Sequence, residues 1–265
     1  MYDGVTGTLD VTTPPPVVYL DMGPLCDLAQ NPGHAERLQT RISRGGTVVF
    51  MRPTLAELAG LTEGPTLDAV AALLDGLGAH FAFADHDPWR AARREAARAL
   101  EPQDAALDEE ALRELHTVTR FPRGTIDASW LLRVVRDARA RWIDEKRVAA
   151  AENLPALTRA SSMPRQGRPP HVLTPGSAIE RCRVELLQRV HVAMPEFDEN
   201  DNMDLFHAMV PLAICDFLLL DKHWAGLAAQ VPAPPRRAQV FSGKKGQIPA
   251  FLDALEAWTP APEVK

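Results

Sequence analysis

The chain has 265 residues, of which 46% are hydrophobic, and it carries 29 Lys+Arg against 35 Asp+Glu, a formal net charge of −6. This composition excludes an intrinsically disordered chain and is sufficient for a buried core in one large domain or two small ones. Taken as a total, the negative charge argues against binding to nucleic acid, because affinity for phosphate comes from Lys and Arg.

Residues 1–16 are polar and end in three prolines, so we expect a flexible lead-in that cannot join a sheet. It shows no basic, apolar signal-peptide pattern, and the sequence contains no apolar run of membrane-spanning length. The cysteines Cys26, Cys182 and Cys215 lie far apart in apolar stretches. We therefore expect a cytoplasmic protein with reduced thiols.

The first predicted strand is Val17–Leu20, which is continuously apolar and is followed by Asp21. A helical stretch over 25–30 and a Gly-Gly turn lead to a second such strand, Thr47–Met51. A helix then opens near Pro53 and carries Glu57 about one turn in. This alternation of strands and helices predicts an α/β fold with a central parallel sheet of four or five strands.

Between 66 and 192 the pattern is helical and contains no strong strand, so we expect a large helical insertion within a single domain spanning 17–265. Residues 125–152 are typical of one long helix, and 159–176 of a loop. Ser177 and Glu180 have the spacing of a capping box that starts another helix.

The last third returns to α/β. An acidic turn over 196–204 leads into a helix, and a short apolar strand, Phe217–Leu220, follows and ends at Asp221. A weaker strand over 238–241 and a closing helix over 248–258 complete the pattern.

Acidic residues follow two predicted strands and begin two adjoining helices: Asp21, Asp221, Glu57 and Asp204. In open parallel sheets, ligands bind outside the carboxyl ends of the strands. Four carboxylates gathered there repel one another unless a cation lies among them, and oxygen ligands favour Mg²⁺ or Mn²⁺. The pattern therefore predicts a divalent metal site at that edge.

Each residue also has a structural interpretation that the sequence leaves open. Asp201 and Asp216 have the positions of caps, Asp21 of a turn residue, and Glu57 of a solvated helix residue. His207 is more typical of a core histidine, or of one that orients a metal ligand, than of a ligand itself. His80 and His86, beside Asp85 and Asp87, lack a recurrent zinc spacing.

The segment NDNMDLFHAMVPLAICDFLLLD, together with LDMGPLCDL and RPTLAEL, resembles the PIN-like metal-dependent nucleases. The resemblance covers roughly 17–60 and 196–242. It implies that Asp21, Glu57, Asp204 and Asp221 are catalytic metal ligands and that Asp201 and Asp216 are auxiliary carboxylates. Leu220 departs from the pattern, since that family often has Ser or Thr before its last Asp.

A candidate substrate surface lies in residues 120–168, which carry eleven basic and five acidic side chains, a local charge of +6. Arg159, Arg165 and Arg168 fall in the predicted loop and are the candidate nucleic-acid contacts. The alternative is a solvated helix face with ion pairs between successive turns. The net charge of −6 is thus the sum of a basic segment and an acidic remainder.

The resulting hypothesis is a Mg²⁺- or Mn²⁺-dependent endonuclease that hydrolyses phosphodiester bonds, with RNA favoured over DNA by the resemblance alone. The alternatives are a catalytically inactive PIN-like module that binds nucleic acid or a protein, and a small-molecule phosphohydrolase. A second copy of the chain and a cognate regulatory protein are further candidate partners.

Overall fold

The computed structural model describes residues 2–3, 8–9, 13–58, 60–78, 80–108, 111, 177–194, 199–233, 236–244 and 246–259. The candidate substrate segment 120–168 therefore lies outside the described residues. Among the described helices, none is both long and apolar enough to cross a membrane.

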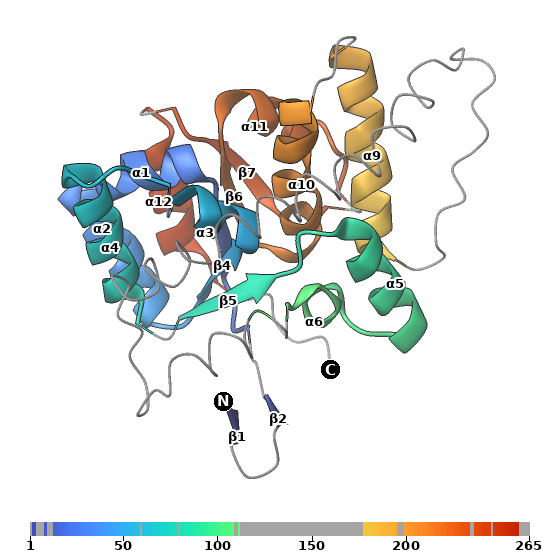
Figure 1. The fold of residues 1–265 in the computed structure, drawn as a ribbon, viewed down its shortest axis with the longest axis horizontal. Coiled ribbons are helices and arrows are strands. Elements are labelled where there is room, and N and C mark those ends of the chain that lie inside the picture. Colours follow the sequence, from blue (N-terminus) through green and yellow to red (C-terminus); the bar gives the residue numbers. More distant parts are fainter. Residues whose placement is uncertain are drawn as a thin grey trace.

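The centre of the fold is a five-stranded sheet in which every described pair of neighbouring strands is parallel (Figure 1). Its strands are β3 (Val17–Leu20), β4 (Thr47–Met51), β5 (Phe81–Ala84), β6 (Phe217–Leu220) and β7 (Gln239–Ser242). Their spatial order is β5-β4-β3-β6-β7. The predicted α/β class with a parallel sheet is confirmed.

The strands are apolar on both faces because helices cover both sides of the sheet. In β3, Val17 and Tyr19 belong to one buried cluster, whereas Val18 and Leu20 belong to another. The same alternation holds in β4 and β6. A strand buried on both faces loses the apolar–polar alternation of a half-exposed strand, which explains the continuous apolar runs in the sequence.

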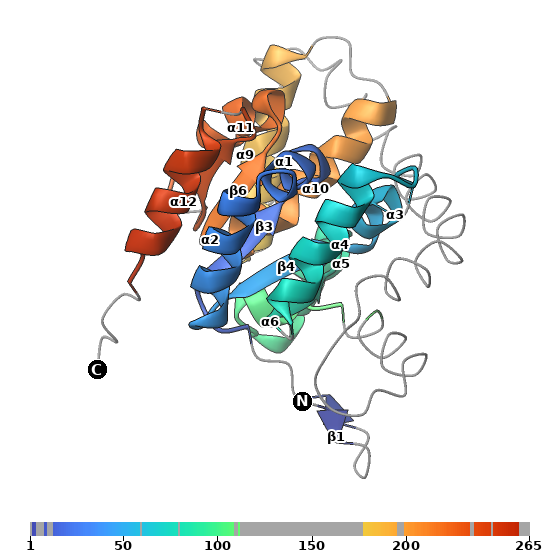
Figure 2. The ribbon, with the colours of Figure 1, turned by 90° about the vertical axis from the view of Figure 1, so that its left-hand side faces the viewer.

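The helices form the two outer layers (Figures 1 and 2). One face carries α1 (Met22–Ala29), α2 (Pro32–Ser43), α3 (Arg52–Leu58), α4 (Pro65–Leu77) and α12 (Ile248–Ala257). The other carries α5 (Pro88–Arg98), α6 (Pro102–Ala106), α9 (Ala178–Ala193), α10 (Glu199–Ile214) and α11 (Lys222–Ala229).

The structure contains two features that the sequence analysis did not anticipate. Strand β5 lies inside 66–192 and pairs with β4, so the beginning of that segment belongs to the central sheet and not to a helical insertion. In the lead-in, β1 (Tyr2–Asp3) and β2 (Thr8–Leu9) form a small antiparallel pair of their own, separate from the main sheet. The prolines before β3 are also tied to the fold, because Thr47 donates its hydroxyl to the Pro14 carbonyl.

The start of α9 is capped partly as the sequence predicts. The Ser177 hydroxyl accepts a hydrogen bond from the Glu180 N–H at 3.0 Å. The Glu180 carboxylate, however, pairs with Arg183. The buried carboxylate of Glu95 on α5 accepts from the Ser177 hydroxyl and from the N–H groups of Ala178 and Ile179. This carboxylate joins α5 to α9 at the positive end of the helix dipole.

Candidate metal centre at the carboxyl edge of the sheet

The chain direction across the sheet reverses between β3 and β6. From β3 it runs outward through β4 to β5, and it then returns to the other side of β3 for β6 and β7. In a parallel sheet this reversal opens a crevice at the carboxyl ends of the two strands, where ligands bind. Asp21 follows β3 and Asp221 follows β6, so both residues lie at this position.

Asp21 is held by both strand ends. Its backbone N–H donates to the Leu219 carbonyl at 2.9 Å, which continues the β3–β6 ladder by one residue. Its side chain caps α1, since Oδ1 accepts from the Met22 N–H at 2.9 Å. The carboxylate is therefore fixed in position by the strand before it and the helix after it.

Asp221 repeats this arrangement on the neighbouring strand. Its Oδ1 accepts from the Trp224 N–H at 2.9 Å and so caps α11. Both aspartates thus cap helices, a role that the sequence analysis considered for Asp201 and Asp216 but not for these two, and both stand at the strand ends where the metal hypothesis places them. Capping and metal binding use different lone pairs of a carboxylate, so the two roles are compatible.

His207 on α10 brings the first two predicted ligands together. Its Nδ1 lies 3.5 Å from Asp21 Oδ1, and its Nε2 lies 3.8 Å from Glu57 Oε1. The imidazole is 4% exposed, whereas Asp21 and Glu57 retain 17% and 31% exposure of their side chains. A buried ring with one nitrogen toward each carboxylate orients both groups while leaving them accessible from solvent.

The surroundings of Asp21 favour its ionised form. Burial by itself would raise the pKa of this carboxyl group, but the hydrogen bond and charge of His207 and the N–H groups of Met22 and Asp221 outweigh it. The net result is a lowered pKa for Asp21. An ionised carboxylate is the form that binds a divalent cation.

Asp201 and Asp204 precede His207 on the same helix, α10. Helix α10 begins at Glu199, so Asp201 lies in its first turn and is not the N-cap. Asp204 is exposed and stands three residues before His207, about one helical turn away. The helix thus includes part of the acidic segment 196–204, which the sequence analysis assigned to a turn.

The interpretation of Asp216 as an auxiliary carboxylate is wrong. Asp216 precedes β6 and lies at the amino end of the sheet, where its Oδ2 accepts from the Val17 N–H at 2.8 Å. Its Oδ1 accepts from Arg237 Nε at 2.7 Å. The four residues of β6 separate Asp216 from Asp221, so the two carboxylates lie at opposite ends of that strand. Through its two contacts Asp216 joins β3 to the segment that precedes β7.

Strand β5 is also followed directly by an aspartate, Asp85. The sequence analysis did not predict this strand and so did not place Asp85 at a strand end. Asp85 is buried and its carboxylate accepts from Arg90 at 2.5 and 2.6 Å and from Arg94 at 2.9 Å. Burial would raise the pKa of Asp85, but the hydrogen bonds and charges of Arg90 and Arg94 lower it overall. Because these arginines already neutralise Asp85, it is a structural residue and a poor metal ligand.

The three arginines predicted to contact nucleic acid, Arg159, Arg165 and Arg168, lie outside the described residues. On the part of the chain that the structure describes, no group of three or more His, Cys, Asp or Glu side chains is close enough together to hold a metal ion directly. Mg²⁺, however, keeps several waters and uses one or two protein carboxylates together with substrate phosphates. Asp21 and Glu57, oriented by one imidazole, fit such a hydrated ion.

In comparisons with known proteins, no family model, curated protein or solved structure matches the chain significantly.

Proposed function

We propose that the protein is a Mg²⁺- or Mn²⁺-dependent endonuclease that hydrolyses phosphodiester bonds, with RNA favoured over DNA as substrate. The observation that carries the proposal is the contact of one buried imidazole, His207, with carboxylates that follow two neighbouring strands, Asp21 and Glu57. Asp221 borders the same crevice and Asp204 lies one turn along α10. Such carboxylates at a switch point suit a hard cation and a phosphate ester.

The residues have distinguishable tasks in this proposal. Asp21, Glu57, Asp204 and Asp221 would hold one or two ions, which would neutralise charge on the phosphodiester and activate water. Asp21, fixed by Met22 and His207, provides a rigid ionised group. Glu57 is the more exposed of the two carboxylates that face His207, so it is the better placed to accept a proton from water.

Two observations favour an inactive PIN-like module instead. The described carboxylates do not form a ready three-ligand metal group. Leu220, at the position where a hydroxyl residue is common in the resembling family, is buried in the sheet. In this alternative the edge of the sheet would bind nucleic acid or a protein without cutting it.

A cleavage assay distinguishes the two. Single-stranded RNA and DNA are incubated with the protein and Mn²⁺, and the wild type is compared with Asp21→Asn and Asp221→Asn. We expect metal-dependent RNA cleavage that falls by about two orders of magnitude or more in each variant. Cleavage that persists in both variants, or that survives chelation of the metal, would refute the assignment.

The matched control is Asp68→Asn, which removes an exposed carboxylate from the first turn of α4 that is not among the proposed ligands. It should retain wild-type activity. Mn²⁺ binding measured by titration calorimetry without substrate separates the proposals further. Binding that is lost in Asp21→Asn without any cleavage by the wild type would favour the inactive module.

A further inference from the structure

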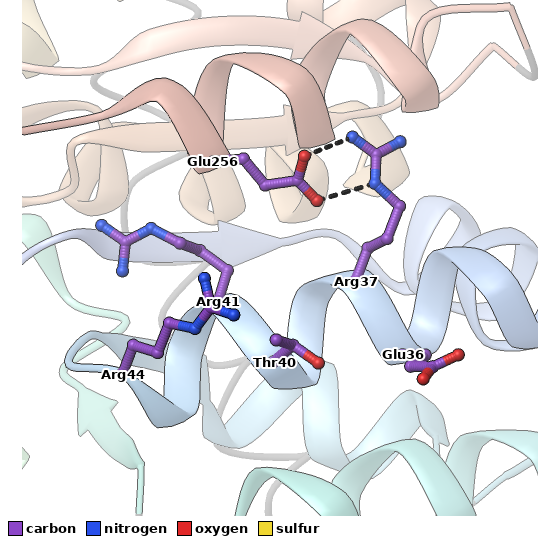
Figure 3. A pocket seen from close by; sticks show the side chains of 6 residues that line it. All are labelled: Glu36, Arg37, Thr40, Arg41, Arg44 and Glu256. Carbon is purple, nitrogen blue, oxygen red and sulfur yellow. Dashed lines mark hydrogen bonds and ion pairs between the residues drawn. The ribbon is translucent and has the colours of Figure 1, made fainter.

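A second feature of the molecule lies at the opposite end of the sheet from the carboxylates. A cavity of about 340 Å³ between α2 and α12 is lined by Glu36, Arg37, Thr40, Arg41, Arg44 and Glu256 (Figure 3). It adjoins the turn before β4, because Arg41 donates to the Gly45 carbonyl. We call it the arginine pocket.

One of its three arginines is already neutralised. Arg37 on α2 donates to both oxygens of Glu256 on α12 at 2.7 Å (Figure 3). It also donates to Asp253 of α12 at 2.6 Å. This pair joins the two helices and forms one wall of the pocket. One guanidinium here faces the carboxylates of Glu256 and Asp253, and Glu36 adds a further carboxylate to the lining, so the positive charge that remains in the pocket comes from Arg41 and Arg44.

Arg41 is a fixed cation whose hydrogen-bond partners are carbonyl groups. It donates to the carbonyls of Leu255, Gly45 and Trp258, and its Cζ lies 5.7 Å from the centre of the Trp258 ring. These contacts hold the guanidinium in place, but none of them supplies a full negative charge. Among the described residues, no carboxylate pairs with Arg41.

Arg44 places a second positive charge beside the first. Its side chain is exposed and makes no hydrogen bond or ion pair with the described residues. Burial and then the nearby charge of Arg44 lower the pKa of Arg41. Two neighbouring positive charges repel each other, and an anion between them would relieve the repulsion.

We propose that the arginine pocket binds a phosphate group. Guanidinium groups match phosphate oxygens with paired N–H donors, and Thr40 adds a hydroxyl on the same wall. Arg41 is preorganised by its carbonyl contacts, so little side-chain entropy is lost when the anion binds. The phosphate belongs either to a free phosphate compound or to the backbone of a nucleic acid, and the experiment below separates these sources.

The first arm of the test uses pyrophosphate and the full chain, without divalent metal, in a calorimetric titration at low salt. We expect saturable binding that weakens about tenfold or more in Arg44→Gln, since a hydrogen bond to a charged group is lost. The matched control is Arg93→Gln, which removes an exposed arginine from α5 on the other face of the sheet. Wild-type pyrophosphate affinity in Arg44→Gln, or equal weakening in Arg93→Gln, would overturn the proposal.

The second arm identifies the source of the phosphate. A short single-stranded RNA without terminal phosphates is titrated into Asp21→Asn, with and without Arg44→Gln, so that cleavage does not interfere. Weakening of both RNA and pyrophosphate binding by Arg44→Gln assigns the pocket to the nucleic-acid backbone, whereas weakening of pyrophosphate binding alone assigns it to a free phosphate compound. Because the first arm contains no metal and measures no cleavage, it can succeed even if the proposed nuclease activity is absent.

Discussion

The imidazole of His207 lies 3.5 Å from the carboxylate of Asp21, although 186 residues separate them in the chain. Through this contact the last third of the sequence controls the ionisation of a group that follows the first strand of the sheet.

Replacing His207 with Gln should raise the pKa of Asp21. Burial, which raises this pKa, would remain, whereas the hydrogen bond and charge of His207, which lower it, would be lost. A depressed folded-state pKa stabilises the protein above the unfolded value of about 4, and this stability is lost as pH falls through the folded value. The variant should therefore show a weaker loss of stability on acidification.

The pKa of Asp21 is measured by NMR titration of its carboxyl carbon. The titration of Asp85, whose partners are Arg90 and Arg94, serves as the internal control and should not move. An unchanged Asp21 midpoint in His207→Gln would contradict this account.

Replacing Asp216 with Asn should destabilise the fold without changing Mn²⁺ affinity. Its carboxylate joins the Val17 N–H to Arg237, and weakening these bonds should cost about 2 kcal/mol in the free energy of unfolding. Asp221→Asn should do the reverse and weaken Mn²⁺ binding more than it affects stability. Denaturant unfolding and calorimetry on both variants check the pair, and a loss of Mn²⁺ affinity in Asp216→Asn would restore it as a site residue.

Replacing His86 with Gln should flatten the dependence of stability on pH below neutrality. Burial is the main cause that lowers the pKa of His86, and its Nδ1 has no hydrogen-bond partner. As the pH falls below about 6.5, the unfolded chain therefore takes up a proton more readily than the folded protein does, and stability falls. The free energy of unfolding at several pH values tests this, with the exposed His223→Gln as control. An identical slope in wild type and His86→Gln would be inconsistent with a buried neutral ring.

Replacing Gly243 with Ala should destabilise the carboxyl edge. A Cβ there would lie 2.3 Å from Pro24 Cγ and 3.3 Å from the Leu220 carbonyl, so α1 or the end of β7 must move. We expect a loss of about 1–3 kcal/mol, as for other overpacked positions. Gly226→Ala meets nothing within 4 Å inside α11 and should be neutral or stabilising by up to about 1 kcal/mol. Thermal unfolding of the two variants compares them directly, and equal melting temperatures would contradict the close packing.

The strands that the sequence predicted well are those buried between two helical layers. Strands β3, β4 and β6 have the predicted bounds because their apolar, β-branched or leucine-rich runs are unbroken. Strand β5, with the sequence Phe-Ala-Phe-Ala, was missed because alanine favours helices and its neighbours are helical. Its identification as a strand depends on pairing with β4, which local sequence does not encode.

The candidate site was predicted in part for a similar reason. Asp21 and Asp221 could be placed because a residue that directly follows a parallel strand lies at the carboxyl edge. Asp216 was misplaced because it precedes its strand, so one short strand puts it at the other end of the sheet. The contact of His207 with both Asp21 and Glu57 depends on how α10 packs across the sheet, which spacing along the chain does not specify.

The order of the strands has a consequence for how the protein is made. The middle strand β3 leaves the ribosome early, but one of its two neighbours, β6, is synthesised nearly two hundred residues later. A nascent chain that has not reached residue 207 contains Asp21 and Glu57 without the ring that orients them. Long-range pairing of this kind is slow to form. A growing chain therefore lacks a complete carboxylate edge, which for an RNA-cutting protein would protect the message being translated.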